Sequence, residues 1–188
     1  MITGTMVELG PFGPDLITGE YLGWLNDKSL MRYSRQRLTS HTRDTALDYL
    51  RSFESSPNKF WAIYRRPDRL HIGTMTAYVD RAAGSADIGI LVGHAEARGR
   101  GFGREAWGLA MDYLFRVEGV DNVTGGTSAL NTAMVRVFHH WQMRLEEVEK
   151  DAEMIDGRPA DVLRFGMLCR EWEQAHPCPI ARLSETRR

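Results

Sequence analysis

A stretch rich in glycine and arginine constrains this chain more than any other feature. Residues 98–103 read RGRGFG and lie between a strand-like segment, ADIGILVG at 86–93, and a helical pattern that starts at Arg104. Glycine lets a backbone approach a ligand closely, and a helix N-terminus offers unpaired N–H groups and a partial positive charge. The stretch therefore predicts a site for phosphate or pyrophosphate, to which its arginines would add charge-assisted hydrogen bonds.

Two common phosphate-binding motifs do not fit this stretch. The P-loop pattern G-x-x-x-x-G-K-[ST] does not occur in the sequence. The dinucleotide fingerprint G-x-G-x-x-G would begin at Gly99 and would need a glycine where the chain has Arg104. The pattern [Q/R]-x-x-G-x-[G/A] does fit, with Arg98, Gly101 and Gly103 at its fixed positions.

Hydrophobic periodicity predicts, in order, two helices, three strands, a helix, a strand, a helix and two strands. The helices are expected at 15–27, 40–56, 104–117 and 131–143, and the strands at 59–65, 71–80, 86–93, 122–129, 144–155 and 160–169. This order predicts an α/β (α+β) fold with a mainly antiparallel front half. We expect a single domain over 1–188, with its core at about 15–173 and a flexible tail at 174–188.

Composition limits the partners and the location of the protein. The net charge of −1 over 188 residues gives no general attraction to nucleic acid or to an anionic membrane. The N-terminus lacks a basic start followed by an apolar run, and no apolar stretch approaches the ~20 residues that span a bilayer. The two cysteines have no zinc-like spacing. We therefore expect a cytoplasmic protein without a metal, membrane or nucleic-acid partner, and a homodimer is compatible with the sequence.

The loop pattern resembles the pyrophosphate loop of the GCN5-related N-acetyltransferase (GNAT) family, whose members bind acetyl-CoA. Other segments are similar to its ribosomal-protein acetyltransferase branch and occur in the same order: WLND, MRYS, a strand with an Ile-Gly pair before the loop, N-x-A-M and REWE. The resemblance covers about 15–173. It implies a single-domain GNAT-like fold, in which a mixed, mostly antiparallel sheet has one splayed strand and helices on both faces.

The resemblance also implies how acetyl-CoA is held. Leu91 and Val92 would expose backbone groups to the pantetheine arm, with an N–H near Val92 facing the thioester oxygen. Gly93 is compatible with an opening of the strand there, and Asn131 would lie near the pantetheine arm. The pyrophosphate would contact the loop residues Arg98, Gly99, Arg100, Gly101, Phe102, Gly103 and Arg104.

The sequence departs from the family pattern where many members carry a tyrosine that protonates the departing thiolate. Phe138 occupies that position beside the cofactor and cannot donate a proton. Because a thiol has a pKa near 8.5, water could suffice. The adjacent His139 and His140 could act as acid or base, but at most one can face the cofactor, and both read equally as surface histidines.

Asp87 is our first choice for the base that deprotonates the acceptor amine, because relatives often have a carboxylate at this place that works through water. The alternative is a solvent-facing or hydrogen-bonded strand residue. Acceptor binding is expected in the basic, aromatic segment after the first helix, at Tyr33, Ser34, Arg35, Arg37 and His41. As a group these residues suit an acceptor that carries phosphate or carboxylate.

Three functions remain open at this point. The first is transfer of the acetyl group of acetyl-CoA to a primary amine on a nucleotide-linked amino sugar, a protein N-terminus or a small molecule. The second is a non-catalytic acyl-CoA-binding module, which Phe138 favours. The third is an interaction domain in which the loop is only a turn.

Overall fold

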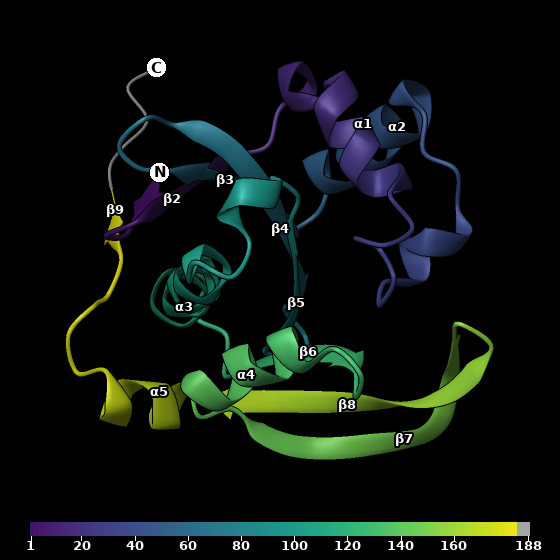
Figure 1. Ribbon diagram of the computed structural model, residues 1–188. Helices are drawn as coiled ribbons and strands as arrows, with labels where there is room; N and C mark the ends of the chain where they lie inside the picture. Colours follow the sequence, from purple (N-terminus) through teal and green to yellow (C-terminus); the bar gives the residue numbers. More distant parts are fainter. Residues whose placement is uncertain (184–188) are drawn as a thin grey trace.

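The computed structural model describes residues 1–183 and places them around one nine-stranded sheet in the order β7-β8-β6-β5-β4-β3-β2-β1-β9 (Figure 1). Every neighbouring pair is antiparallel except the parallel pair β5 and β6. The expected mixed, mostly antiparallel sheet is therefore confirmed. The strands are β1 (Ile2–Thr3), β2 (Val7–Pro11), β3 (Lys59–Arg65), β4 (Leu70–Asp80), β5 (Ser85–Val92), β6 (Asn122–Ser128), β7 (Arg144–Ile155), β8 (Arg158–Leu168) and β9 (Arg182–Leu183).

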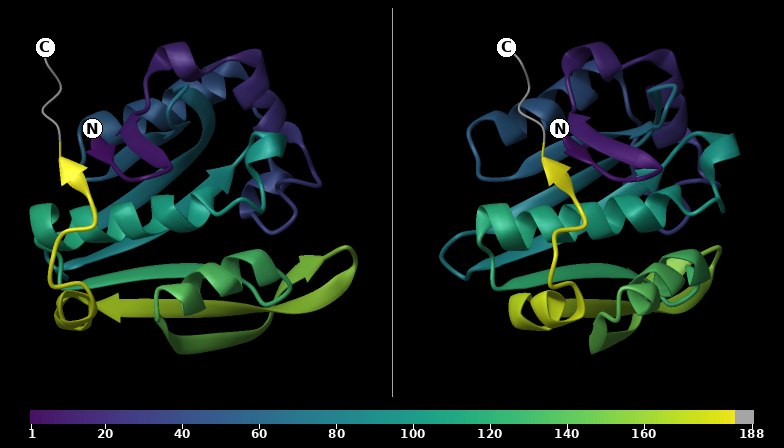
Figure 2. Two further views of the ribbon diagram at one scale, coloured as in Figure 1. Left: turned by 60° about the vertical axis from the view of Figure 1, so that its left-hand side comes forward. Right: turned by 90° about the vertical axis from the view of Figure 1, so that its left-hand side faces the viewer.

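Helices lie on both faces of the sheet, as expected. The first two, α1 and α2, cover one face, and the sheet curls around α3 on the other (Figures 1 and 2). The helices are α1 (Gly19–Asn26), α2 (Arg43–Glu54), α3 (Phe102–Tyr113), α4 (Thr132–His140) and α5 (Cys169–Ala175). Within residues 1–183, no helix combines the length and the apolar character that a membrane span requires.

Two apolar cores hold these layers together. Around α3, Trp107 and Leu109 are 1% exposed and Leu114 is fully buried. On the other face, Phe53 of α2 packs against Phe60 of β3 with ring centroids 5.1 Å apart. The periodic apolar residues that predicted these helices are thus the residues that hold them against the sheet.

Helix α3 holds the N-terminal segment through Glu105. Its carboxylate accepts hydrogen bonds from three consecutive backbone N–H groups, those of Thr5 at 2.8 Å, Met6 at 2.7 Å and Val7 at 2.8 Å. This carboxylate fixes the turn between β1 and β2 against the helix.

Asp112, seven residues after Glu105 on α3, fixes the C-terminal segment against the helix in the same way. Its side chain is 2% exposed, and it accepts from Trp172 Nε1 at 2.9 Å and from the N–H groups of Ile180 and Ala181 at 3.1 Å each. Arg116 Nε also donates to it at 2.8 Å. The buried charge is therefore compensated on several sides.

Both ends of the described chain differ from the boundaries that the sequence predicts. Strands β1 and β2 precede residue 15, and β9 pairs with β1, with Leu183 opposite Ile2. Residues 174–183, expected as part of a flexible tail, thus contact the body of the protein. These strands are too short to show a periodic pattern, which explains the difference. The remainder of that tail, 184–188, lies outside the described residues.

We expect Asp112→Asn to lower the free energy of unfolding by about 2–4 kcal/mol, because the amide loses the charge and turns an N–H₂ group toward buried donors. Urea unfolding measures this change. The matched control is Asp48→Asn, which alters a carboxylate that is 72% exposed and paired with Arg51. The control should stay within about 0.5 kcal/mol of the wild type. Equal stabilities of the two variants would show that Asp112 does not anchor the C-terminal segment.

Candidate active site

The strands β5 and β6 separate part-way along their length. They pair only where Ser85–Asp87 meets Asn122–Thr124, whereas β5 stays paired with β4 as far as Val92. Beyond Asp87, no strand among residues 1–183 pairs with the β6 side of β5, so backbone groups there face a gap. This is the splayed strand that the resemblance implies.

The glycine-rich loop connects the end of β5 to α3. Gly99 and Gly101 have φ values of +73° and +88°, in the left-handed region that favours glycine. The first recorded hydrogen bond of the helix runs from Glu105 N to Gly101 O at 3.0 Å. The N–H groups of Phe102, Gly103 and Arg104 precede this bond, and they have no helical partner one turn back. Such unpaired groups suit an anion, and the anion-binding role that the sequence predicts for them stays a prediction.

The arginines of the loop differ in what they contact. The Arg98 guanidinium donates to Gly93 O at 2.8 Å and so ties the loop to the end of β5. The Arg104 carbonyl accepts from Trp141 Nε1 at 2.8 Å, which fixes the first turn of α3 against the segment after α4. Arg100 is exposed, between the two left-handed glycines. Arg98 thus has a structural contact, while Arg100 stands at the surface of the loop.

Gly93 has a packing role that the sequence does not reveal. A Cβ at this position would lie 2.0 Å from the Trp24 ring, so only glycine lets α1 pack against the end of β5. The strand opening that we associated with Gly93 begins earlier, after Asp87.

A cavity of about 720 Å³ extends from the gap beside β5 to the segment after α1 and to the β7–β8 hairpin. Several residues predicted for cofactor, acceptor or catalysis line it: Tyr33, Ser34, Arg35, His41, Asp87, Leu91 and Asn131. Other predicted residues lie outside this lining: Arg37, Val92, Gly93, the loop 98–104, Phe138, His139 and His140. The structure therefore brings the predicted base and most predicted acceptor residues into one space.

Asp87 lies on β5 at the point where the strands separate. Thr124 Oγ1 donates to Asp87 Oδ2 at 2.8 Å, and Arg164 Nη1 lies 3.5 Å from the same oxygen. The side chain is 47% exposed, so it is accessible from the cavity rather than buried. The other oxygen, Oδ1, has no recorded partner within residues 1–183 and is available to accept a proton.

The structure places Phe138 and the two histidines away from this cavity. Phe138 is fully buried and stacks on Phe165 at 4.6 Å, so it is a core residue instead of a cofactor contact. His139 and His140 are exposed near the end of α4. Burial, followed by the charge of Arg104, lowers the pKa of His140, which favours its neutral form. Neither histidine lies with Asp87 in the cavity.

Asn131 lines the cavity and caps α4 with its side chain. Its Oδ1 accepts from Met134 N at 3.2 Å, and its Nδ2 donates to Thr127 Oγ1 at 3.0 Å. The role near the pantetheine arm that the resemblance implies stays a prediction. The N-cap explains locally why an asparagine suits this position.

Besides Tyr33, two tyrosines line the cavity, but neither is a good substitute for the missing acid. Burial raises the pKa of Tyr21 to about 12. Burial, together with a 2.6 Å hydrogen bond to Tyr78, also raises the pKa of Tyr49. Both hydroxyls stay protonated at neutral pH, so they can donate hydrogen bonds, but a raised pKa makes them weaker acids.

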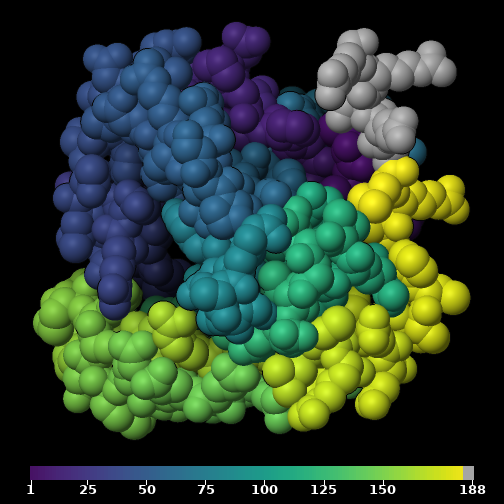
Figure 3. Space-filling model, turned by 180° about the vertical axis from the view of Figure 1, so that it is seen from behind, coloured from purple at the N-terminus to yellow at the C-terminus, as the bar shows by residue number. Residues whose placement is uncertain are grey.

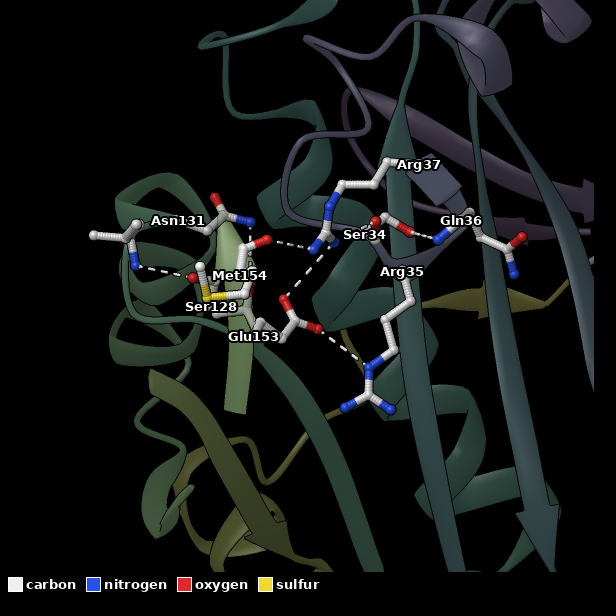
Figure 4. Close-up of polar contacts among 10 residues, drawn as sticks. Ser34, Arg35, Gln36, Arg37, Ser128, Asn131, Glu153 and Met154 are labelled. Atoms are coloured by element: carbon white, nitrogen blue, oxygen red, sulfur yellow. Dashed lines mark hydrogen bonds and ion pairs between the residues drawn. The ribbon is translucent and has the colours of Figure 1, made fainter. Parts of the chain in front are cut away.

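The predicted acceptor segment reaches the tip of the β7–β8 hairpin. Arg35 Nε lies 3.1 Å from Glu153 Oε1, and Arg37 Nη2 donates to Met154 O at 2.9 Å (Figure 4). Sequence reasoning missed the hairpin's contribution to the cavity, which consists of Glu149, Glu153, Val162 and Arg164. The charged residues of the hairpin carried no motif that could have identified them.

Comparison with known proteins agrees with this geometry. The sequence profile of the acetyltransferase (GNAT) domain family matches residues 9–144. An uncharacterized N-acetyltransferase, p20 of Bacillus licheniformis, is 30% identical over 122 residues, which cover 64% of this chain and 67% of that protein.

Solved structures share the fold at lower identity. Spermidine N-acetyltransferase from Vibrio cholerae, in complex with CoA and spermine, superposes with a TM-score of 0.79 at 18% identity over 89% of this chain and 98% of that chain. A GNAT-family acetyltransferase from Bacillus anthracis gives a TM-score of 0.77 at 15% identity over 90% and 99% of the two chains.

A splayed strand and a glycine-rich loop at a helix N-terminus, together with the matching family profile, identify an acetyl-CoA-dependent acetyltransferase. The chain belongs to the GNAT family, whose members are acetyl-CoA-dependent N-acetyltransferases. The residues present fit this cosubstrate: the start of α3 offers N–H groups to a diphosphate, and β5 offers backbone groups to an amide-containing arm. A Cβ on Gly99 would meet no atom within 4 Å, so this face of the loop is open.

We expect Arg100→Ala to raise the dissociation constant of acetyl-CoA about tenfold without changing the melting temperature, because a charge-assisted hydrogen bond to a phosphate is lost. Calorimetric titration and thermal unfolding measure the two effects. Arg51→Ala, on α2, is the matched control. An Arg100 variant that binds like the control would remove this residue from the diphosphate site.

Proposed function

We propose that the protein transfers the acetyl group of acetyl-CoA to a primary amine that enters the cavity, with Asp87 as the base. The amine belongs to an amino sugar, a peptide N-terminus or a small molecule. The observation that carries the proposal is the position of Asp87, which lies in the cavity where β5 leaves β6.

The surroundings of Asp87 support this role. Both recorded contacts, from Thr124 and Arg164, go to Oδ2, so the carboxylate is oriented while Oδ1 has no recorded partner within residues 1–183. A primary amine is mainly protonated near neutral pH and has to lose a proton before it can attack. Asp87 would accept that proton, directly or through water, in the manner of a positioned general base.

The loop and β5 would position the cosubstrate. Backbone N–H groups at the start of α3, together with Arg100, would hold the diphosphate, and the open side of β5 would align the arm along the gap. Acetyl-CoA supplies the acetyl group as an activated thioester. The N-acetyltransferases to which the chain is similar favour this function over a non-catalytic module, even though Phe138 replaces the tyrosine.

Asp87→Asn is expected to lower kcat at least a hundredfold while the dissociation constant of acetyl-CoA stays within about twofold, because the amide cannot accept the proton. Release of free thiol over a panel of primary amines, together with calorimetric titration, measures both quantities. Glu147→Gln, an exposed residue of β7, is the control. An unchanged kcat would exclude Asp87 as the base, and no thiol release from the wild type with any amine would refute the proposed function.

A further inference from the structure

Two segments more than a hundred residues apart meet at one end of the cavity. Residues 32–37, which follow α1, contact the tip of the β7–β8 hairpin, and Figure 3 shows the two segments touching. Arg32 pairs with Asp156, and Arg37 Nη2 donates to Met154 O at 2.9 Å. The hairpin thus holds the segment in which the sequence predicts acceptor binding.

Glu153 is the centre of this contact. Its Oε1 accepts from Arg35 Nε at 3.1 Å, and its Oε2 lies 3.8 Å from Arg37 Nη1 (Figure 4). The side chain is only 9% exposed, and Oε2 is buried without a hydrogen-bond partner. A carboxylate placed in this way neutralises both guanidinium groups, while its Oε2 stays buried beside Arg37.

This arrangement changes what the basic segment can bind. By composition alone, Arg35 and Arg37 suit a phosphate or carboxylate on the acceptor. In the structure, an anion at this place would lie beside the buried carboxylate of Glu153, and like charges brought together during binding are unfavourable. A neutral or cationic group on the acceptor would not meet this repulsion.

The other charges of the cavity act in the same direction. Asp87 and Glu149 also line it, and both lie near Arg164, at 3.5 Å and 3.4 Å. The guanidinium of Arg164 is therefore already shared between two carboxylates. Apart from His41, each basic side chain that lines the cavity within residues 1–183 has a carboxylate partner.

We propose that Glu153 is a specificity-determining residue that neutralises Arg35 and Arg37, so that the enzyme selects amines whose remaining groups are neutral or cationic and rejects those that carry phosphate or carboxylate. The selection rests on the proposed acetyltransferase function, but the neutralisation can be tested without turnover.

The binding test uses inorganic phosphate as the probe. CoA is added first to fill the loop at α3, and chloride at equal ionic strength is the reference. Tens of millimolar phosphate should raise the melting temperature of Glu153→Gln by about 2–4 °C relative to the wild type, because the Arg35 guanidinium loses its carboxylate partner and the charge of Arg37 is no longer neutralised. Adding Arg35→Gln to this variant should abolish the rise. A wild type that gains as much as Glu153→Gln would overturn the proposal, as would a Glu153→Gln variant that gains nothing.

The activity test compares three acceptors with the same primary amine: propylamine, 1,3-diaminopropane and 3-aminopropyl phosphate. The wild type should use the phosphate compound least, and Glu153→Gln should improve its kcat/KM relative to propylamine about tenfold, through KM. Asp156→Asn is the matched control, because it loses only the pair with Arg32 and an asparagine tolerates the φ of +50° at this position. Equal preferences in Glu153→Gln and the wild type would refute the proposal.

Arg35→Gln tests the same idea should Glu153→Gln fail to fold. Freeing Glu153 Oε1 should raise the use of 1,3-diaminopropane relative to propylamine several-fold, and an unchanged ratio would count against the proposal. The two failures are distinguishable. If no amine gives thiol release, the proposed function is refuted. The comparison with phosphate needs no turnover, so it still decides the role of Glu153.

Discussion

The packing of α3 inside the curled sheet is the constraint on which both the fold and the site depend. Trp107 of this helix packs against Gly125 of β6, where a Cβ would lie 2.8 Å from the ring. Gly103, at the start of the helix, touches β5. The helix therefore contacts β6 next to its last residue paired with β5, and it contacts β5 near the end of that strand. The predicted anion site and the splay depend on the same packing arrangement.

Much of the fold could be predicted because its signals are local. The helices and the long strands follow apolar periodicity, and the glycines of the loop report a backbone conformation that other residues avoid. The chain ends could not be predicted, because Glu105 and Asp112 mostly bind backbone N–H groups there. Any sequence offers such donors, so the ends of the chain show no pattern.

The site residues could be predicted where a motif marks their positions. They could not be predicted where strand register decides which side chains face the cavity. Asp87 and Leu91 lie on β5 beside the gap, Asn131 caps α4, and all three line the cavity, while their roles stay predictions. The hairpin residues escaped prediction because β7 is irregular: Glu149 pairs with Val162, whereas Glu153 pairs with Ala160. The alternation of side chains between the two faces of the sheet is therefore interrupted along β7, and it does not predict which residues face the cavity.

The charges of the cavity connect the proposed base to the proposed choice of acceptor. Arg164 orients Asp87, and Glu153 holds Arg35, so the same hairpin supplies partners to both halves of the site. Within residues 1–183, Asp87 Oδ1 has no recorded hydrogen-bond partner, and Oε2 of Glu153 is buried without one. The guanidinium groups of Arg35 and Arg164, by contrast, already have carboxylate partners. Under the proposed function, the pairing that orients Asp87 would therefore also suit the cavity to amines without an acidic group.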